Sequence, residues 1–128
     1  MYKEFSKSIL FTLKSLTIRE NKNIGSEGCY FFGHMLEINT SLEYFDMSDV
    51  SLIMNFSTVG THALCEGIRK NKTLRILKLE NNNINETHIV DIAGSLSQNR
   101  GLIQVDFINN IIPAIWFQSN TYLTTKVD

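Results

Sequence analysis

The amino-acid sequence predicts an α/β solenoid of about three and a half units, a fold in which one strand-and-helix unit recurs along the chain. The first observation behind this prediction is a repeated apolar pattern whose copies begin at residues 13, 42, 74 and 102. The second is the helical spacing of apolar residues between successive copies. The hydrophobic fraction of 43% is ordinary for a globular chain, which argues against disorder.

The clearest copy of the strand pattern reads Leu74-x-x-Leu77-x-Leu79-x-x-Asn82-x-Ile84. The copies are separated by 29, 32 and 28 residues, so the second unit carries a small insertion, which we place within residues 51–59. The pattern predicts strands near residues 15–19, 44–48, 76–80 and 104–108. The other copies are Leu13-x-x-Leu16-x-Ile18-x-x-Asn21 with Ile24, Leu42-x-x-Phe45-x-Met47-x-x-Val50-x-Leu52, and Leu102-x-x-Val105-x-Phe107-x-x-Asn110-x-Ile112.

Between the strands, apolar residues recur at offsets of four and eight, which places them on one face of a helix. A small residue stands between them each time, as is needed where a helix packs closely on strands. Helices are therefore predicted near residues 27–37, 60–70 and 86–97. The three sets, each counted from its first member, are Gly28, Phe32, Gly33, Leu36; Gly60, Leu64, Cys65, Ile68; and His88, Ile92, Ala93, Leu96. His88 stands where the earlier units have glycine, and we expect it at the surface.

Two columns of asparagine accompany the repeat. Asn21, Asn82 and Asn110 follow the strands and are expected to turn inward and bond backbone groups. Val50 breaks that column, which predicts a local distortion in the unit that also carries the insertion. The second column closes the helices, where asparagine tolerates a left-handed backbone and can act as a cap. Its members are Asn39, Asn71 and Asn99.

These motifs resemble the leucine-rich repeat in its ribonuclease-inhibitor-like form, over about residues 13–112. The resemblance implies a horseshoe arc with parallel strands on the concave face and helices on the convex face. We expect one domain, residues 1–128, with residues 1–12 and 113–128 as irregular flanks. Proteins of this kind include ribonuclease inhibitor, repeat regions of intracellular innate-immune receptors, the actin-capping tropomodulins and activators of the Ran GTPase.

Charge and cysteine content narrow the classes of partner and compartment. The net charge is −1, without a block of like charge, which argues against an electrostatic nucleic-acid or membrane-surface role. No apolar run approaches the ~20 residues of a membrane helix. Cys29 and Cys65 occupy different helical offsets, so they are expected to be free thiols in a cytoplasmic protein.

The residues between the core positions of each strand point to the concave face, where neighbouring strands align them in columns. The three predicted columns are Thr17, Asp46, Lys78, Asp106; Ser15, Tyr44, Ile76, Gln104; and Arg19, Ser48, Glu80, Ile108. We predict a protein-binding surface in which Tyr44 and Ile76 supply apolar area and the charges supply orientation. The alternative is a solvated face whose Asp46, Lys78 and Asp106 charges satisfy one another. The candidate binding residues are Thr17, Arg19, Tyr44, Asp46, Ile76, Lys78, Glu80, Gln104 and Asp106.

Catalytic and metal-binding interpretations are less favoured, and no cofactor is expected. Asp46 and Asp106 stand two strands apart with Lys78 between them, an arrangement unsuited to a general acid. Zinc needs four ligands converging on one point. The spacing of Cys29 and His34 with His62 and Cys65 does not predict that convergence.

The predicted function is therefore that of a non-catalytic protein-interaction module that binds another protein. One alternative is a regulator of GTPase catalysis, which the family resemblance includes. Another is a fragment of a longer array that self-associates through uncapped ends, because each repeat covers its neighbour's core. Against the fragment stands a fold-back of Trp116 and Phe117 over the last unit.

Overall fold

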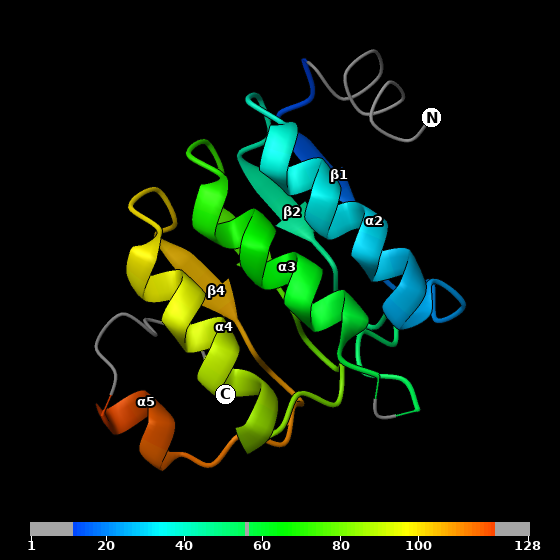
Figure 1. The fold of residues 1–128 in the computed structure, drawn as a ribbon, viewed down its shortest axis with the longest axis vertical. Coiled ribbons are helices and arrows are strands. Elements are labelled where there is room, and N and C mark those ends of the chain that lie inside the picture. The colour runs from blue at the N-terminus through cyan, green and yellow to red at the C-terminus, as the bar shows by residue number, and fades with distance from the viewer. Residues whose placement is uncertain (1–11, 56, 120–128) are drawn as a thin grey trace.

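The structure is a computed structural model that describes residues 12–55 and 57–119 (Figure 1). Strands and helices alternate along these residues. The three long helices lie side by side across one face of a four-stranded sheet. In chain order the elements are β1 (Ser15–Thr17), α2 (Gly25–Ile38), β2 (Tyr44–Asp46), α3 (Val59–Lys70), β3 (Ile76–Lys78), α4 (Glu86–Gln98), β4 (Gln104–Asp106) and α5 (Ile115–Ser119).

The sheet is parallel and its strands lie in sequence order, β1-β2-β3-β4. This arrangement confirms the predicted solenoid, since each strand pairs with the strand of the next unit. The middle residue of every strand points toward the helices and joins the core, as the two-residue period requires. These residues are Leu16, Phe45, Leu77 and Val105, of which the last three are buried and Leu16, in the first unit, is partly buried.

Each strand is two residues shorter than predicted because the chain turns soon after its third residue. Backbone bonding between units continues beyond the strand ends, for example from the N–H of Met47 to the carbonyl of Lys78 at 2.9 Å. The turn then needs a left-handed residue, a conformation that asparagine and aspartate tolerate better than most. The residues with positive φ at this turn are Glu20, Asp49, Asn81 and Asn109.

The asparagines that close the helices were expected to suit a left-handed backbone or a cap, and the structure shows a side-chain role without the left-handed backbone. Asn71 has an extended backbone, with φ −73° and ψ 136°. Its side-chain Oδ1 accepts the N–H groups of Thr73 and Leu74 at 2.9 and 2.7 Å. Its Nδ2 donates to the carbonyls of Leu36 and Asn39 in the preceding unit, at 2.9 and 3.2 Å.

The same bonds recur one unit on, so these residues form an asparagine ladder along the helix ends. Asn99 accepts from Gly101 and Leu102 and donates back to Ile68 and Asn71. Asn39 accepts from Ser41 and Leu42. The ladder satisfies backbone groups of two units at once, which explains why asparagine, with both a donor and an acceptor, occupies this column.

The second asparagine column also turns inward, as predicted. Asn82 is fully buried, accepts from the N–H groups of Val50 and Leu52, and donates to the carbonyl of Met47. Asn110 repeats the pattern on the next unit. Where Val50 interrupts the column, the carbonyl of Ile18 instead accepts from Asn21 of its own unit. Within the segment assigned to the insertion, Ser51 and Asn55 have positive φ.

Helices α2 and α3 approach each other closely through glycine. A Cβ atom at Gly33 would lie 2.4 Å from the backbone of Ala63, and one at Gly67 would lie 2.4 Å from the carbonyl oxygen of Gly33. The small residue predicted at position 33 is therefore needed against the neighbouring helix rather than against a strand. Cys65 and Ala93, in the same column, are buried.

His88 was predicted at the surface, and this prediction is wrong because its ring is part of the cap of α4. Its side chain is largely buried, and Nδ1 accepts the N–H of Asn85 at 3.1 Å. The Asn85 side chain accepts in return from the N–H groups of Thr87 and His88, which completes a capping box. Burial lowers the pKa of His88, against a smaller opposing effect of Asp91.

The C-terminal flank is more regular than predicted. Residues 113–128 were expected to be irregular, but α5 forms at Ile115–Ser119. Trp116 and Phe117 pack against the core, and the ring of Phe117 lies 6.1 Å from that of Phe107 between centroids. The fold-back of these two aromatic residues over the last unit is thus what the structure contains. Residues 1–11 and 120–128 lie outside the described residues.

Replacing Asn71 by alanine removes five side-chain hydrogen bonds, four of them to backbone groups, and leaves buried backbone groups of two units unpaired. We expect a loss of roughly 2–5 kcal/mol in the free energy of unfolding, measured by urea denaturation. Asn23→Ala is the matched control, because Asn23 is exposed, and it should change stability by less than about 0.5 kcal/mol. Equal effects of the two substitutions would contradict the role of the ladder.

The neutral ring of His88 accepts a hydrogen bond that a protonated ring cannot accept. Because folding lowers the pKa of His88 below its ordinary 6.5, stability is complete above pH 6.5 and falls as the pH drops through the folded-state value. His88→Gln keeps a capping-box side chain and should reduce this slope in urea unfolding between pH 7 and 5. His62→Gln, at an exposed histidine, should leave the slope intact; a slope unchanged in His88→Gln would contradict the assignment.

Candidate protein-binding face

The sheet surface opposite the helices carries the first and third residues of each strand and the residue two positions beyond. We call this surface the strand face. The strand register confirms two of the predicted columns, Ser15–Tyr44–Ile76–Gln104 and Thr17–Asp46–Lys78–Asp106. The third column consists of Arg19, Ser48, Glu80 and Ile108.

One end of the strand face is organised by Arg19. Its guanidinium donates to Glu80 at 2.8 Å and to Asp46 at 3.4 Å, and so joins three units of the solenoid. The hydrogen bond to Glu80 raises the pKa of Arg19, which keeps the guanidinium charged. The side chain of Asp46 is only 6% exposed, so its carboxylate needs this cation. The hydroxyl of Ser48 accepts the backbone N–H of Glu80 at 3.1 Å and helps to fix the strand that carries it.

The other end of the face is organised around Asp106. Lys78 Nζ lies 3.7 Å from one carboxylate oxygen of Asp106, and Gln104 donates to both oxygens at 3.1 Å. In the alternative interpretation of the sequence, a solvated face, the charges of Asp46, Lys78 and Asp106 were expected to satisfy one another. In the structure Lys78 pairs with Asp106, whereas Asp46 pairs with Arg19 from the first unit.

Exposure separates the predicted site residues into three groups. Asp46 and Asp106 are buried, and they hold the cations in place rather than presenting a free carboxylate. Thr17 and Arg19 are exposed. The remaining predicted residues are half-buried: Tyr44, Ile76, Lys78, Glu80 and Gln104. Tyr44 and Ile76 are register partners and form the apolar part of the face.

This arrangement suits contact with a surface better than acid–base chemistry. Asp46 and Asp106 are each held by a cationic side chain, Arg19 and Lys78 respectively. In the same part of the chain, no group of three or more histidine, cysteine, aspartate or glutamate side chains is placed to hold a metal ion.

The two cysteines are buried in the core, and His34 contacts a glutamate of its own helix. Cys29 and Cys65 are buried, free thiols, and burial raises the pKa of Cys29 to about 12. Buried thiols of this kind are poor nucleophiles. His34 lies 3.0 Å from Glu37, whose pKa is lowered by the hydrogen bond from Lys70.

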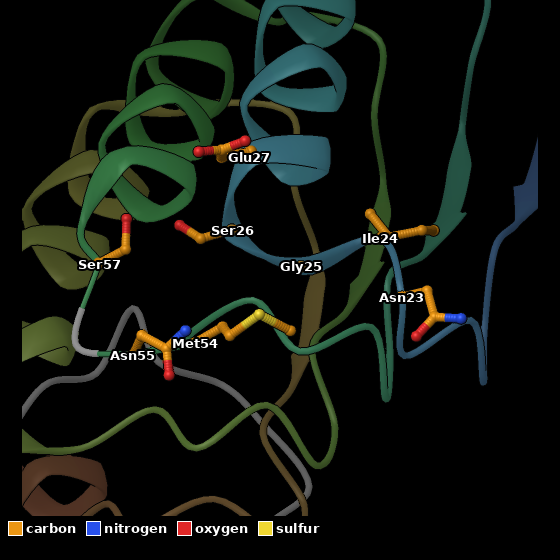
Figure 2. Close-up of a pocket in the computed structure, with 8 residues that line it drawn as sticks. All are labelled: Asn23, Ile24, Gly25, Ser26, Glu27, Met54, Asn55 and Ser57. Atoms are coloured by element: carbon orange, nitrogen blue, oxygen red, sulfur yellow. The ribbon is translucent and has the colours of Figure 1, made fainter.

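A pocket of about 340 Å³ that the sequence did not predict lies at the start of α2 (Figure 2). Among the described residues lining it, Glu27 alone has a charged side chain, and the hydroxyl of Ser26 accepts the N–H of Gly60 at 2.9 Å. Without a cation or a second titratable group, this lining offers neither an anion site nor a catalytic pair. The lining residues are Asn23, Ile24, Gly25, Ser26, Glu27, Met54, Asn55 and Ser57.

Comparison with known proteins identifies the fold. No family model matches the chain, and no curated protein matches it. Among solved structures, actin-binding site 2 of leiomodin-1 superposes with a TM-score of 0.77 at 23% sequence identity, over 97% of this chain and 75% of that one. The tropomodulin C-terminal domain of Caenorhabditis elegans superposes with a TM-score of 0.77 at 14% identity, over 99% of this chain and 80% of that one. The chain has the leucine-rich repeat fold, as the sequence predicted.

The charge network around Arg19 predicts an effect on stability. Arg19→Met keeps the apolar stem but leaves the buried Asp46 carboxylate without its cation, and should lower the free energy of unfolding by roughly 1–2 kcal/mol, since the 40% exposed arginine is partly screened. Lys14→Met breaks an exposed pair with Glu43 and should cost less than about 0.5 kcal/mol. Urea denaturation of both variants checks the difference, and equal losses would contradict the network.

Proposed function

We propose that this chain is a non-catalytic protein-binding module and that its partner is actin. The observation that supports this proposal most directly is the structural likeness to a domain described as actin-binding site 2 of leiomodin-1, which extends over 97% of this chain. The likeness covers the units that build the strand face. A cytoplasmic location would suit such a partner and also suits the buried free thiols. Within the described residues, no helix is long and apolar enough to cross a membrane.

The strand face supplies the contact surface in this proposal. Tyr44 and Ile76 lie side by side on central strands and provide an apolar patch, the kind of feature that contributes most to protein interfaces. Thr17, Arg19, Lys78, Glu80 and Gln104 surround it with polar side chains. The cations among them are held by Asp46 and Asp106, so little side-chain entropy would be lost on binding.

Co-sedimentation with filamentous actin tests the proposal. The unmodified chain should appear in the pellet in proportion to the filament concentration. The double substitution Tyr44→Thr with Ile76→Thr removes the apolar patch while keeping residues that favour strands, and it should weaken binding at least about tenfold. Circular dichroism and urea unfolding should show that the variant is folded.

A matched control replaces two exposed apolar residues on the helical side, Val59→Ala with Val90→Ala, and should leave binding unchanged. Failure of the unmodified chain to sediment with actin would remove actin as the partner. Sedimentation that the strand-face variant leaves unchanged would keep actin and remove the strand face.

A further inference from the structure

A second surface lies at the edge of the solenoid where the helices end and the next strands begin. The loops that follow α3 and α4 lie side by side there (Figure 1). Residues of both loops line a pocket of about 290 Å³. Four of the chain's 12 lysines and arginines line this basic pocket, and no acidic residue does so among the described residues. The four are Arg69, Lys72, Arg75 and Arg100.

Cations near helix C-termini commonly stabilise the helix dipole, and this explains one of the four. Arg69 lies in the last turn of α3 and pairs with Glu66. The other three lie beyond the helix ends, in the connecting loops. The preceding unit has Thr40 and Glu43 at the positions that correspond to Lys72 and Arg75. Lys14 of the first unit also stands at the Arg75 position, but it pairs with Glu43, so among the described residues the unpaired cations of these loops belong to the third and fourth units.

The guanidinium of Arg75 is held by two backbone carbonyl groups, and we call this position its seat. Its Nη1 donates to the carbonyl oxygen of Gly101 at 3.0 Å and to that of Lys72 at 3.5 Å. A Cβ atom at position 101 would lie 2.4 Å from Nη1, so the seat exists because residue 101 has no side chain. Both bonds use one nitrogen of a planar group with five N–H donors, which leaves donors for an anion.

The two loops are held in place by the asparagine ladder. Lys72 and Arg100 each follow a ladder residue directly, Asn71 or Asn99. The ladder also accepts the loop N–H groups of Thr73, Leu74, Gly101 and Leu102. These backbone donors are therefore not available to cradle a phosphate, and recognition of an anion falls to the spaced cationic side chains.

We propose that the basic pocket binds an acidic segment of a partner protein, with aspartate or glutamate carboxylates meeting Arg75, Lys72 and Arg100. Separate carboxylates along a polypeptide match cations carried on two loops, and a bidentate carboxylate matches the seated guanidinium. This site lies on a different surface from the strand face. It therefore stands whether or not the strand face binds actin.

The test measures binding of a fluorescein-labelled poly-glutamate peptide to the full chain by fluorescence anisotropy. Binding should weaken as salt rises from 50 to about 300 mM, because the contacts are exposed. Arg100→Glu should weaken binding at least about tenfold. Lys22→Glu makes the same charge change on the opposite edge, at an exposed residue, and should weaken binding less than about twofold.

Gly101→Ala provides a second variant without a change of charge. The added methyl group meets the flexible end of Arg75 at 2.4 Å and lies 3.2 and 3.3 Å from the carbonyl oxygens of Lys72 and Leu74. A shift of a few tenths of an ångström relieves the backbone contacts, so the chain should stay folded by circular dichroism while binding weakens about three- to tenfold. Absence of peptide binding, or equal losses in Arg100→Glu and Lys22→Glu, would overturn the proposal. Displacement of the peptide by inorganic phosphate at low millimolar concentration and constant ionic strength would also overturn it, in favour of a phosphate site.

Discussion

Each unit of this solenoid depends on its neighbours for the hydrogen bonds of its own backbone. The turns that join helices to strands leave N–H and carbonyl groups unpaired inside the protein, where an unpaired group costs free energy. Asparagine side chains supply the missing partners in both columns, and they do so across unit boundaries. Asn71 is representative, because it ties its own loop to two carbonyls of the unit before it. The loops and strands therefore hold fixed positions although they contain little regular secondary structure.

This rigidity is what positions the two proposed binding surfaces. On the strand face, buried carboxylates hold exposed or half-buried cations, so that the charge pattern belongs to the fold rather than to freely moving side chains. At the helix-end edge, the ladder holds the loops that carry Lys72 and Arg100. Because these surfaces are already ordered, binding a protein partner on them costs less conformational entropy than binding it on a mobile loop would.

Much of the fold was predictable because each repeat shows the same spacing of apolar residues. Spacing alone placed the helices and the strand register, since apolar side chains at fixed offsets must share one core. It did not place the left-handed residues. Asparagine suits both a left-handed turn and a side-chain cap, and its identity alone does not separate Asn71, which is extended, from Asn81, which has positive φ.

The site residues were less predictable, for a physical reason. A strand-face position can hold either a contact residue or the buried counter-ion of its neighbour, and the two roles use the same amino acids. Asp46 and Asp106 were predicted as contact residues but are buried. The hydrogen-bond partner of Asp46 is Arg19, which lies 27 residues away in the sequence. The burial of His88 was missed for a related reason. The third helical position of a capping box is typically Glu or Gln, so a histidine there does not suggest a cap. The signal that could have revealed it is Asn85, three residues earlier.

Native-state hydrogen exchange of the loop amides tests the central claim most directly. The N–H groups of Leu74 and Leu102 lie outside the helices and strands but donate to the asparagine ladder. If the ladder couples the units, these amides should exchange with free energies of opening close to that of global unfolding. Exchange at the rate of exposed loop amides would contradict the account, since the loops would then open independently of the fold.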